Sequence, residues 1–215
     1  MKLSTYRLIE IIKKEFITNI RQRAIFATMT MFALTTLACI SLSIQGAKLE
    51  AELLSALLWI IIFFASTAVN QVFDDEAILM LKVYGESQII LFGKMIYALL
   101  SMFMLMIFLV PTFVILFDCD IAEPLHLIIT IILGICGIAV AGTMISALVS
   151  VSSFKSGLFP ILLFPLILPI FLLAIDLTTS AFIGGVTADS SIIAMLMYDA
   201  ILTVAASILF DYLWY

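Results

Sequence analysis

The chain has 215 residues, of which 65% are hydrophobic and 12% charged, and its net charge is −5. A soluble domain of this size could not bury so much apolar surface, so the composition excludes a soluble globular protein and indicates an integral membrane protein. The sequence contains no Gly-x-x-x-x-Gly-Lys-Ser/Thr loop, which excludes ATP hydrolysis by that route.

The first 23 residues have the pattern of an amphipathic helix. Ile9, Ile12 and Phe16 recur on one face, whereas Glu10 and Lys14 lie away from it and form a favourable i,i+4 pair. We interpret residues 1–23 as a helix lying on the membrane surface. A soluble helix packed on a partner is the alternative interpretation.

Six apolar segments follow, each near the roughly 20 residues that a helix needs to cross a bilayer. We place these spans at about 24–44, 52–70, 95–117, 125–149, 158–176 and 193–212. The sequence therefore predicts an all-α polytopic membrane protein with about six transmembrane helices, forming one transmembrane domain over residues 1–215.

The basic residues favour one orientation in the membrane. With six spans, nine of the ten Lys and Arg residues fall on the side of the N-terminal segment, and only Lys48 falls on the other side. Short loops rich in Lys and Arg stay in the cytoplasm. We therefore expect both termini in the cytoplasm.

The densest acidic cluster, Asp74-Asp75-Glu76, lies between the second and third spans. Carboxylates suit the first turn of a helix, and Gly85 is placed to end one. The sequence therefore predicts a short cytoplasmic helix at about 74–84. Its apolar face suits contact with another protein.

The fifth span contains Pro165 and Pro169, four residues apart and on one helix face. Each proline removes a backbone donor and disturbs the carbonyl groups of the preceding turn, so we expect a kinked helix packed inside a bundle. We interpret this helix as a hinge or as the lining of a transport path. A static kink is the alternative.

Asp199 lies about 10 Å along the sixth apolar segment at 1.5 Å per residue. A carboxylate at that depth is costly and tends to face a cavity or a polar partner, which would suit a residue on a transport path. The alternative is that the span begins later and that Asp199 is interfacial.

Histidine and cysteine do not form a recognisable metal or haem motif. His126 is the only histidine, and the three cysteines, Cys39, Cys119 and Cys136, form no Cys-x-x-Cys pair. A metal or haem site normally shows several donor residues at a recognisable spacing in the sequence, and this chain does not. We therefore expect no metal site and no catalytic residue. Cys119 falls in a short predicted loop, where it could react, whereas the other two cysteines fall inside spans.

The order of these elements resembles the permease subunit of an ABC exporter, of the ABC-2 type. More narrowly, the run 162–171, Leu-Leu-Phe-Pro-Leu-Ile-Leu-Pro-Ile-Phe, is similar to a Leu-Pro-x-x-x-Pro segment of the cytochrome c maturation B subunit, the haem exporter permease. Phe73-Asp74-Asp75-Glu76 resembles the start of that family's cytoplasmic Phe-x-x-Asp box. The family's Asp-Gly continuation and Pro-rich turn are missing here, because Glu76 runs directly into Ala77.

The resemblance implies a non-catalytic subunit of the bacterial cytoplasmic (inner) membrane, with no nucleic-acid partner. It implies a separate ATP-binding subunit, a second copy of the chain, other cytochrome c maturation membrane proteins as partners, and haem as cargo. The residues that it would place against the ATPase are Phe73, Asp74, Asp75, Glu76 and Leu79. Two alternatives remain: an exporter of a lipid, drug or glycan, and a membrane scaffold that assembles partners without transport.

Overall fold

The computed structural model describes residues 23–44, 48–69, 87–150, 158–184 and 189–214. These residues form the helices α2 (Arg23–Ile44), α3 (Ala51–Val69), α5 (Ser87–Phe117), α6 (Pro124–Ser150), α7 (Leu158–Ile183) and α8 (Asp189–Trp214). The predicted surface helix at 1–23, except for its last residue, and the predicted cytoplasmic helix at 74–84 lie outside the described residues.

Four of the described helices could cross a bilayer by their length and apolar composition. They are Ser87–Phe117, Pro124–Ser150, Leu158–Ile183 and Ser190–Tyr212. α2 and α3 contribute shorter apolar stretches, Thr30–Ile44 and Ala51–Thr67. The prediction of an all-helical membrane protein is confirmed, whereas the count of six spans stays a prediction.

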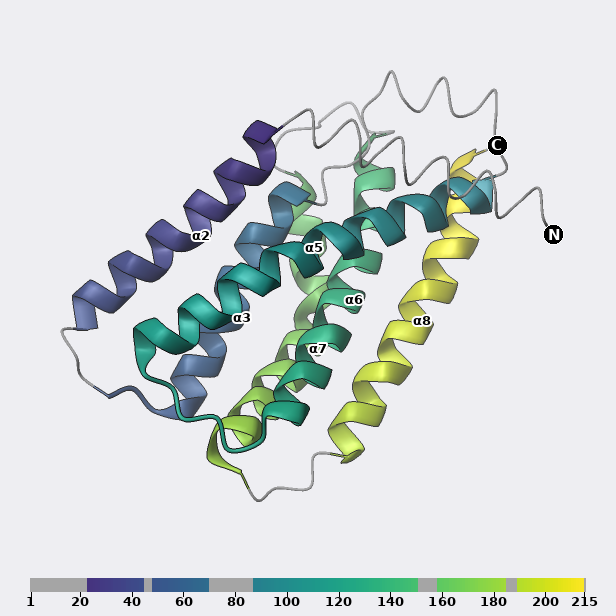
Figure 1. The fold of residues 1–215 in the computed structure, drawn as a ribbon. Coiled ribbons are helices and arrows are strands. Elements are labelled where there is room, and N and C mark those ends of the chain that lie inside the picture. Colours follow the sequence, from purple (N-terminus) through teal and green to yellow (C-terminus); the bar gives the residue numbers. More distant parts are fainter. Residues whose placement is uncertain (1–22, 45–47, 70–86, 151–157, 185–188, 215) are drawn as a thin grey trace.

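α6 lies at the centre of the bundle and packs against α5, α7 and α8 (Figure 1). In its most apolar stretch of 18 residues, 67% of the residues are buried inside the bundle, against 17% to 33% in the corresponding stretches of the three other candidate spans. The buried residues of α6 include Gly134, Gly137, Ala139 and Ala141. These small residues let neighbouring helices approach the α6 backbone closely.

α5 begins at Ser87, eight residues before the predicted start of the third span at 95. Its 31 residues correspond to about 46 Å at 1.5 Å per residue, more than the roughly 30 Å of a bilayer core. Figure 1 shows α5 running obliquely across the bundle, from the end of α8 towards the end of α2. Lys94 directly precedes the predicted start of this span at 95, but it is fully buried within α5.

α7 and α8 also extend beyond the predicted spans. α7 continues past Asp176, which is exposed, to Ile183, and α8 begins at Asp189 rather than at 193. Gly184 then ends α7: its φ is +79°, and its N–H donates to the carbonyl oxygen of Ser180 at 2.8 Å. Glycine adopts this left-handed conformation without the strain that a side chain would add.

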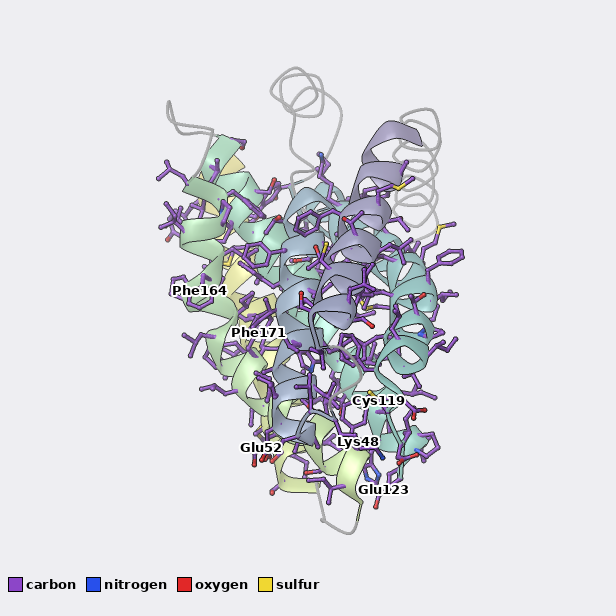
Figure 2. The ribbon with its side chains drawn as sticks, turned by 90° about the vertical axis from the view of Figure 1, so that its left-hand side faces the viewer. Lys48, Glu52, Cys119, Glu123, Phe164 and Phe171 are labelled. Carbon is purple, nitrogen blue, oxygen red and sulfur yellow. The ribbon has the colours of Figure 1, made fainter. Side chains whose placement is uncertain are left out.

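Residues 48–50 and 118–123, which fall between predicted spans on the predicted side of Lys48, lie at one end of the bundle. Figure 2 shows Lys48, Glu52, Cys119 and Glu123 at that end, where α3 and α6 begin and α5 finishes. This end is called the outer end below, after its predicted position; its orientation in the membrane stays a prediction.

Candidate functional site

Asp199 is the most unusual polar residue among the described helices. It lies ten residues after Asp189, where α8 begins. The residue as a whole is partly exposed, but both carboxyl oxygens are buried, and neither has a hydrogen-bond partner among the described residues. α8 therefore directs this carboxyl group into the bundle.

The carboxyl group of Asp199 lies against Gly137 of α6. A methyl group at Gly137 would collide with Oδ1 of Asp199 and with Cδ1 of Ile170 in α7, and it would lie 3.3 Å from the carboxyl carbon of Asp199. The carboxyl group of Asp199 therefore fits here because Gly137 has no side chain. We call this meeting point of α6, α7 and α8 the Asp199 site; its members are Asp199, Gly137 and Ile170.

The neighbouring residue of α8 contacts the proline-containing helix. The hydroxyl of Tyr198 donates to the carbonyl oxygen of Leu166 at 2.8 Å. Leu166 lies three residues before Pro169, within the turn that this proline disturbs. A neighbouring helix thus supplies a polar contact to this turn, one residue along from Pro165, whose carbonyl loses its helical donor to Pro169. α7 is one continuous helix through Pro165 and Pro169, and its roles as hinge and path lining stay predictions.

The other face of α7 is fixed by an aromatic contact with α3. Trp59 is fully buried and donates from Nε1 to Thr178 Oγ1 at 2.9 Å, while that hydroxyl donates to a carbonyl of α7. The rings of Phe63 and Phe171 are 5.7 Å apart between centroids and meet edge to face. Figure 2 shows Phe164 and Phe171 on the same side of the bundle. This contact holds α7 in place beside the Asp199 site.

A second polar contact joins α5 to α8 at the end opposite the outer end. The carboxylate of Asp211 accepts a hydrogen bond from Ser87 Oγ and another, at 2.7 Å, from Gln88 Nε2. Gln88 Nε2 also donates to the carbonyl of Ser207 at 3.2 Å. This contact was not predicted from the sequence. Asp211 falls at the end of the predicted span 193–212, and nothing in the sequence indicates its partners on α5.

The outer end carries ordinary polar contacts. Nδ1 of His126 lies 2.5 Å from a carboxylate oxygen of Glu123, one turn away at the start of α6. Burial of Cys119, together with the charges of Asp118 and Asp120, raises the pKa of its thiol to about 11. This thiol is therefore a weak nucleophile at neutral pH, which argues against the reactive role considered above. Within the described ranges, no three His, Cys, Asp or Glu side chains gather to hold a metal ion.

The five residues predicted to contact an ATPase all fall between 73 and 79, outside the described residues. Their role stays a prediction. Of the other predicted site residues, Pro165, Pro169 and Asp199 lie in α7 and α8, which pack against each other.

Comparison with known proteins identifies the family. The family model described as CcmB protein matches residues 6–210, which is nearly the whole chain. No curated protein and no solved structure matches the chain at the significance threshold applied. The match confirms the resemblance drawn from the double-proline run and the order of the apolar segments. The chain therefore belongs to the CcmB family, whose members are membrane components of haem transport in cytochrome c biogenesis.

Proposed function

We propose that the chain is the permease subunit of an ABC transporter complex that handles haem for c-type cytochrome biogenesis, and that a separate subunit hydrolyses the ATP. The observation that carries this proposal is the CcmB match over residues 6–210, on a chain whose described helices form an apolar bundle. A second copy of the chain and other cytochrome c maturation proteins complete the complex.

In this proposal α2 and α3 also cross the membrane, which gives six spans in the bacterial inner membrane with both termini in the cytoplasm. The distribution of charge supports this orientation. Lys48 is the one basic residue, of the ten in the sequence, that lies on the predicted outer side. Glu52 and Glu123 lie at the same end of the bundle (Figure 2). An end poor in Lys and Arg faces away from the cytoplasm.

The proposal assigns the ATPase contact to the cytoplasmic segment at about 74–84. This segment combines three consecutive carboxylates with apolar residues at helical spacing, and it directly precedes α5. The residues assigned to the contact are Phe73, Asp74, Asp75, Glu76 and Leu79. Movement of the ATPase would then reach the membrane through the start of α5.

The cargo assignment is tested in a strain that lacks this gene, assayed for covalent haem in its c-type cytochromes. We expect the holocytochromes to be lost and the gene to restore them. Full holocytochrome levels in the deletion strain would refute a role in this pathway. A partner ATPase that cannot hydrolyse ATP should give the same loss, whereas unchanged holocytochrome levels with that partner would indicate a scaffold instead of a transporter.

The ATPase contact is tested by co-purification of the ATP-binding subunit with a Phe73→Ala, Asp75→Lys double variant. We expect co-purification to fall at least tenfold, because one apolar anchor is removed and one charge is reversed. Asp120→Lys is the matched control, since it makes the same charge reversal at an exposed position of the outer end. Undiminished co-purification of the double variant would contradict the contact.

A further inference from the structure

The Asp199 site has a feature that the proposed function does not use. Both carboxyl oxygens are buried against Gly137 and Ile170, and neither has a hydrogen-bond donor among the described residues. A carboxylate in that setting would carry an uncompensated charge inside the apolar part of the bundle, which is strongly unfavourable.

The groups around Asp199 do not neutralise it. α6 contributes Cys136, which lies close enough to interact electrostatically with Asp199, and α7 contributes the hydrocarbon side chain of Ile170. On α8 itself, the hydroxyl of Tyr198 donates to a carbonyl of α7 instead. α5 also packs against α8, but its buried Lys94 makes no hydrogen bond with the carboxyl group.

The packing also limits what can occupy the site. A metal ion would require several further oxygen or nitrogen ligands, and no cluster of three such side chains exists in the described parts of the chain. A water molecule would need space beside the carboxyl oxygens, but both oxygens are out of contact with solvent, and even a methyl group would not fit at Gly137. A proton is the one ligand that requires no further space.

We propose that Asp199 is a proton-binding site inside the bundle, occupied while α8 packs against Gly137 of α6. When α8 separates from α6, the carboxyl group reaches water and its O–H bond breaks. The proton passes to a water molecule, and the electron pair stays on the carboxylate. The packed arrangement therefore holds one proton more than the separated one, so low pH favours packing and high pH favours separation. This inference goes beyond the proposed function and depends on neither the cargo nor the ATPase.

The direct test is infrared spectroscopy of the purified full-length chain at neutral pH in an alkyl maltoside detergent, which contains no ester carbonyl group. A protonated carboxylic acid has a carbonyl stretching band that a carboxylate lacks. We expect this band in the wild-type protein and its loss in Asp199→Asn. Asp176→Asn is the matched control, because it removes an exposed carboxylate of α7, and it should leave the band unchanged. A wild-type spectrum without the band, or a band that persists in Asp199→Asn, would overturn the proposal.

A second measurement follows the consequence for packing. The midpoint of thermal unfolding of the wild-type protein should fall between about pH 4, where the carboxyl group of an unfolded aspartate loses its proton, and neutral pH by several degrees more than that of Asp199→Asn. If Asp199→Asn does not fold, Asp199→Ala serves in both experiments, because it removes the titrating group and leaves room at Gly137. Equal pH dependence of the wild type and the neutral variant would contradict proton binding, even if the ATPase contact proves correct.

Discussion

Replacing Gly134 of α6 by alanine tests how tightly α6 packs against α3. A methyl group at this position would collide with two atoms, Cη2 and Cζ3, of the six-membered ring of Trp59. A third ring atom, Cζ2, would lie only 3.1 Å away. Trp59 cannot easily move aside, because it is fully buried and its Nε1 is held by Thr178. We therefore expect Gly134→Ala to destabilise the protein.

The size of this effect follows from two opposing contributions. Inserting a methyl group into a packed interface costs about 1–3 kcal/mol. Alanine, however, favours a helix over glycine by about 1 kcal/mol. The net loss of unfolding free energy should therefore be about 0–2 kcal/mol.

A double-mutant cycle with Trp59→Phe separates the collision from other effects of the glycine substitution. Phenylalanine lacks the outer ring atoms that a methyl group at Gly134 would meet, so the collision should disappear. Trp59→Phe alone costs about 1 kcal/mol for the lost hydrogen bond, with a further loss for the space that it leaves. In the double variant, Gly134→Ala should cost about 1–2 kcal/mol less than in the wild type, within the range found for residues in contact.

The assay is equilibrium unfolding of the purified chain in mixed micelles. Loss of helix is monitored by circular dichroism instead of tryptophan fluorescence, because Trp59 is itself replaced. Each of the four proteins of the cycle is titrated under the same conditions. If the two substitutions destabilise the protein additively, the ring of Trp59 does not lie against Gly134, and the packing argument is wrong. If Gly134→Ala stabilises the wild type, the helix preference outweighs the collision, and the argument also fails.

Three further predictions concern single side chains. Thr178→Val should cost about 1–3 kcal/mol in the same unfolding assay, because the buried Nε1–H of Trp59 loses its acceptor, whereas Thr178→Ser should cost less. Tyr198→Phe removes the hydrogen bond to the proline-containing turn of α7 and should cost about 1 kcal/mol; no change would show that the turn finds another partner. Cys119, whose pKa is raised to about 11, should react slowly with a maleimide at neutral pH and faster as the pH rises towards that value. Asp118→Asn removes a charge that raises this pKa and should speed the labelling at fixed pH, and rapid labelling of the wild type at neutral pH would contradict the shift.

The sequence was sufficient to predict the fold class, because a chain that is 65% hydrophobic must place most of its side chains in lipid or in a helical core. Helix boundaries were predicted less well where a charge lies inside a helix. Lys94 looked like the edge of a span, since hydropathy marks a lysine as a boundary. α5 nevertheless begins at Ser87 and buries Lys94, because helical hydrogen bonding depends on the backbone and can continue through a lysine.

The candidate site could be predicted only in part, for a physical reason. A carboxylate far inside an apolar segment is costly wherever the helix lies, so Asp199 stood out from its own position alone. Its neighbour Gly137 could not be identified, because a glycine is recognised as a contact point only when the opposing helix is known. The same limit applied to Asp211, whose hydrogen bond with Gln88 joins positions 123 residues apart. Local spacing along a helix contains no information about such pairs.

α8 carries both Asp199 and Asp211, the two carboxyl groups whose neighbours could not be predicted from the sequence. Asp211 and Asp199 lie on one uninterrupted helix, and their separation of twelve positions corresponds to about 18 Å. Because Ser87 and Gln88 both donate to Asp211, a displacement of the start of α5 acts directly on α8. The same α8 seats the carboxyl group of Asp199 against α6, where a small outward movement would separate the group from Gly137. A rigid helix held at both places is the kind of element that can carry coupling through a packed bundle. Proton release at Asp199 and movement at the start of α5, which follows the proposed ATPase contact, would then be two consequences of one displacement of α8.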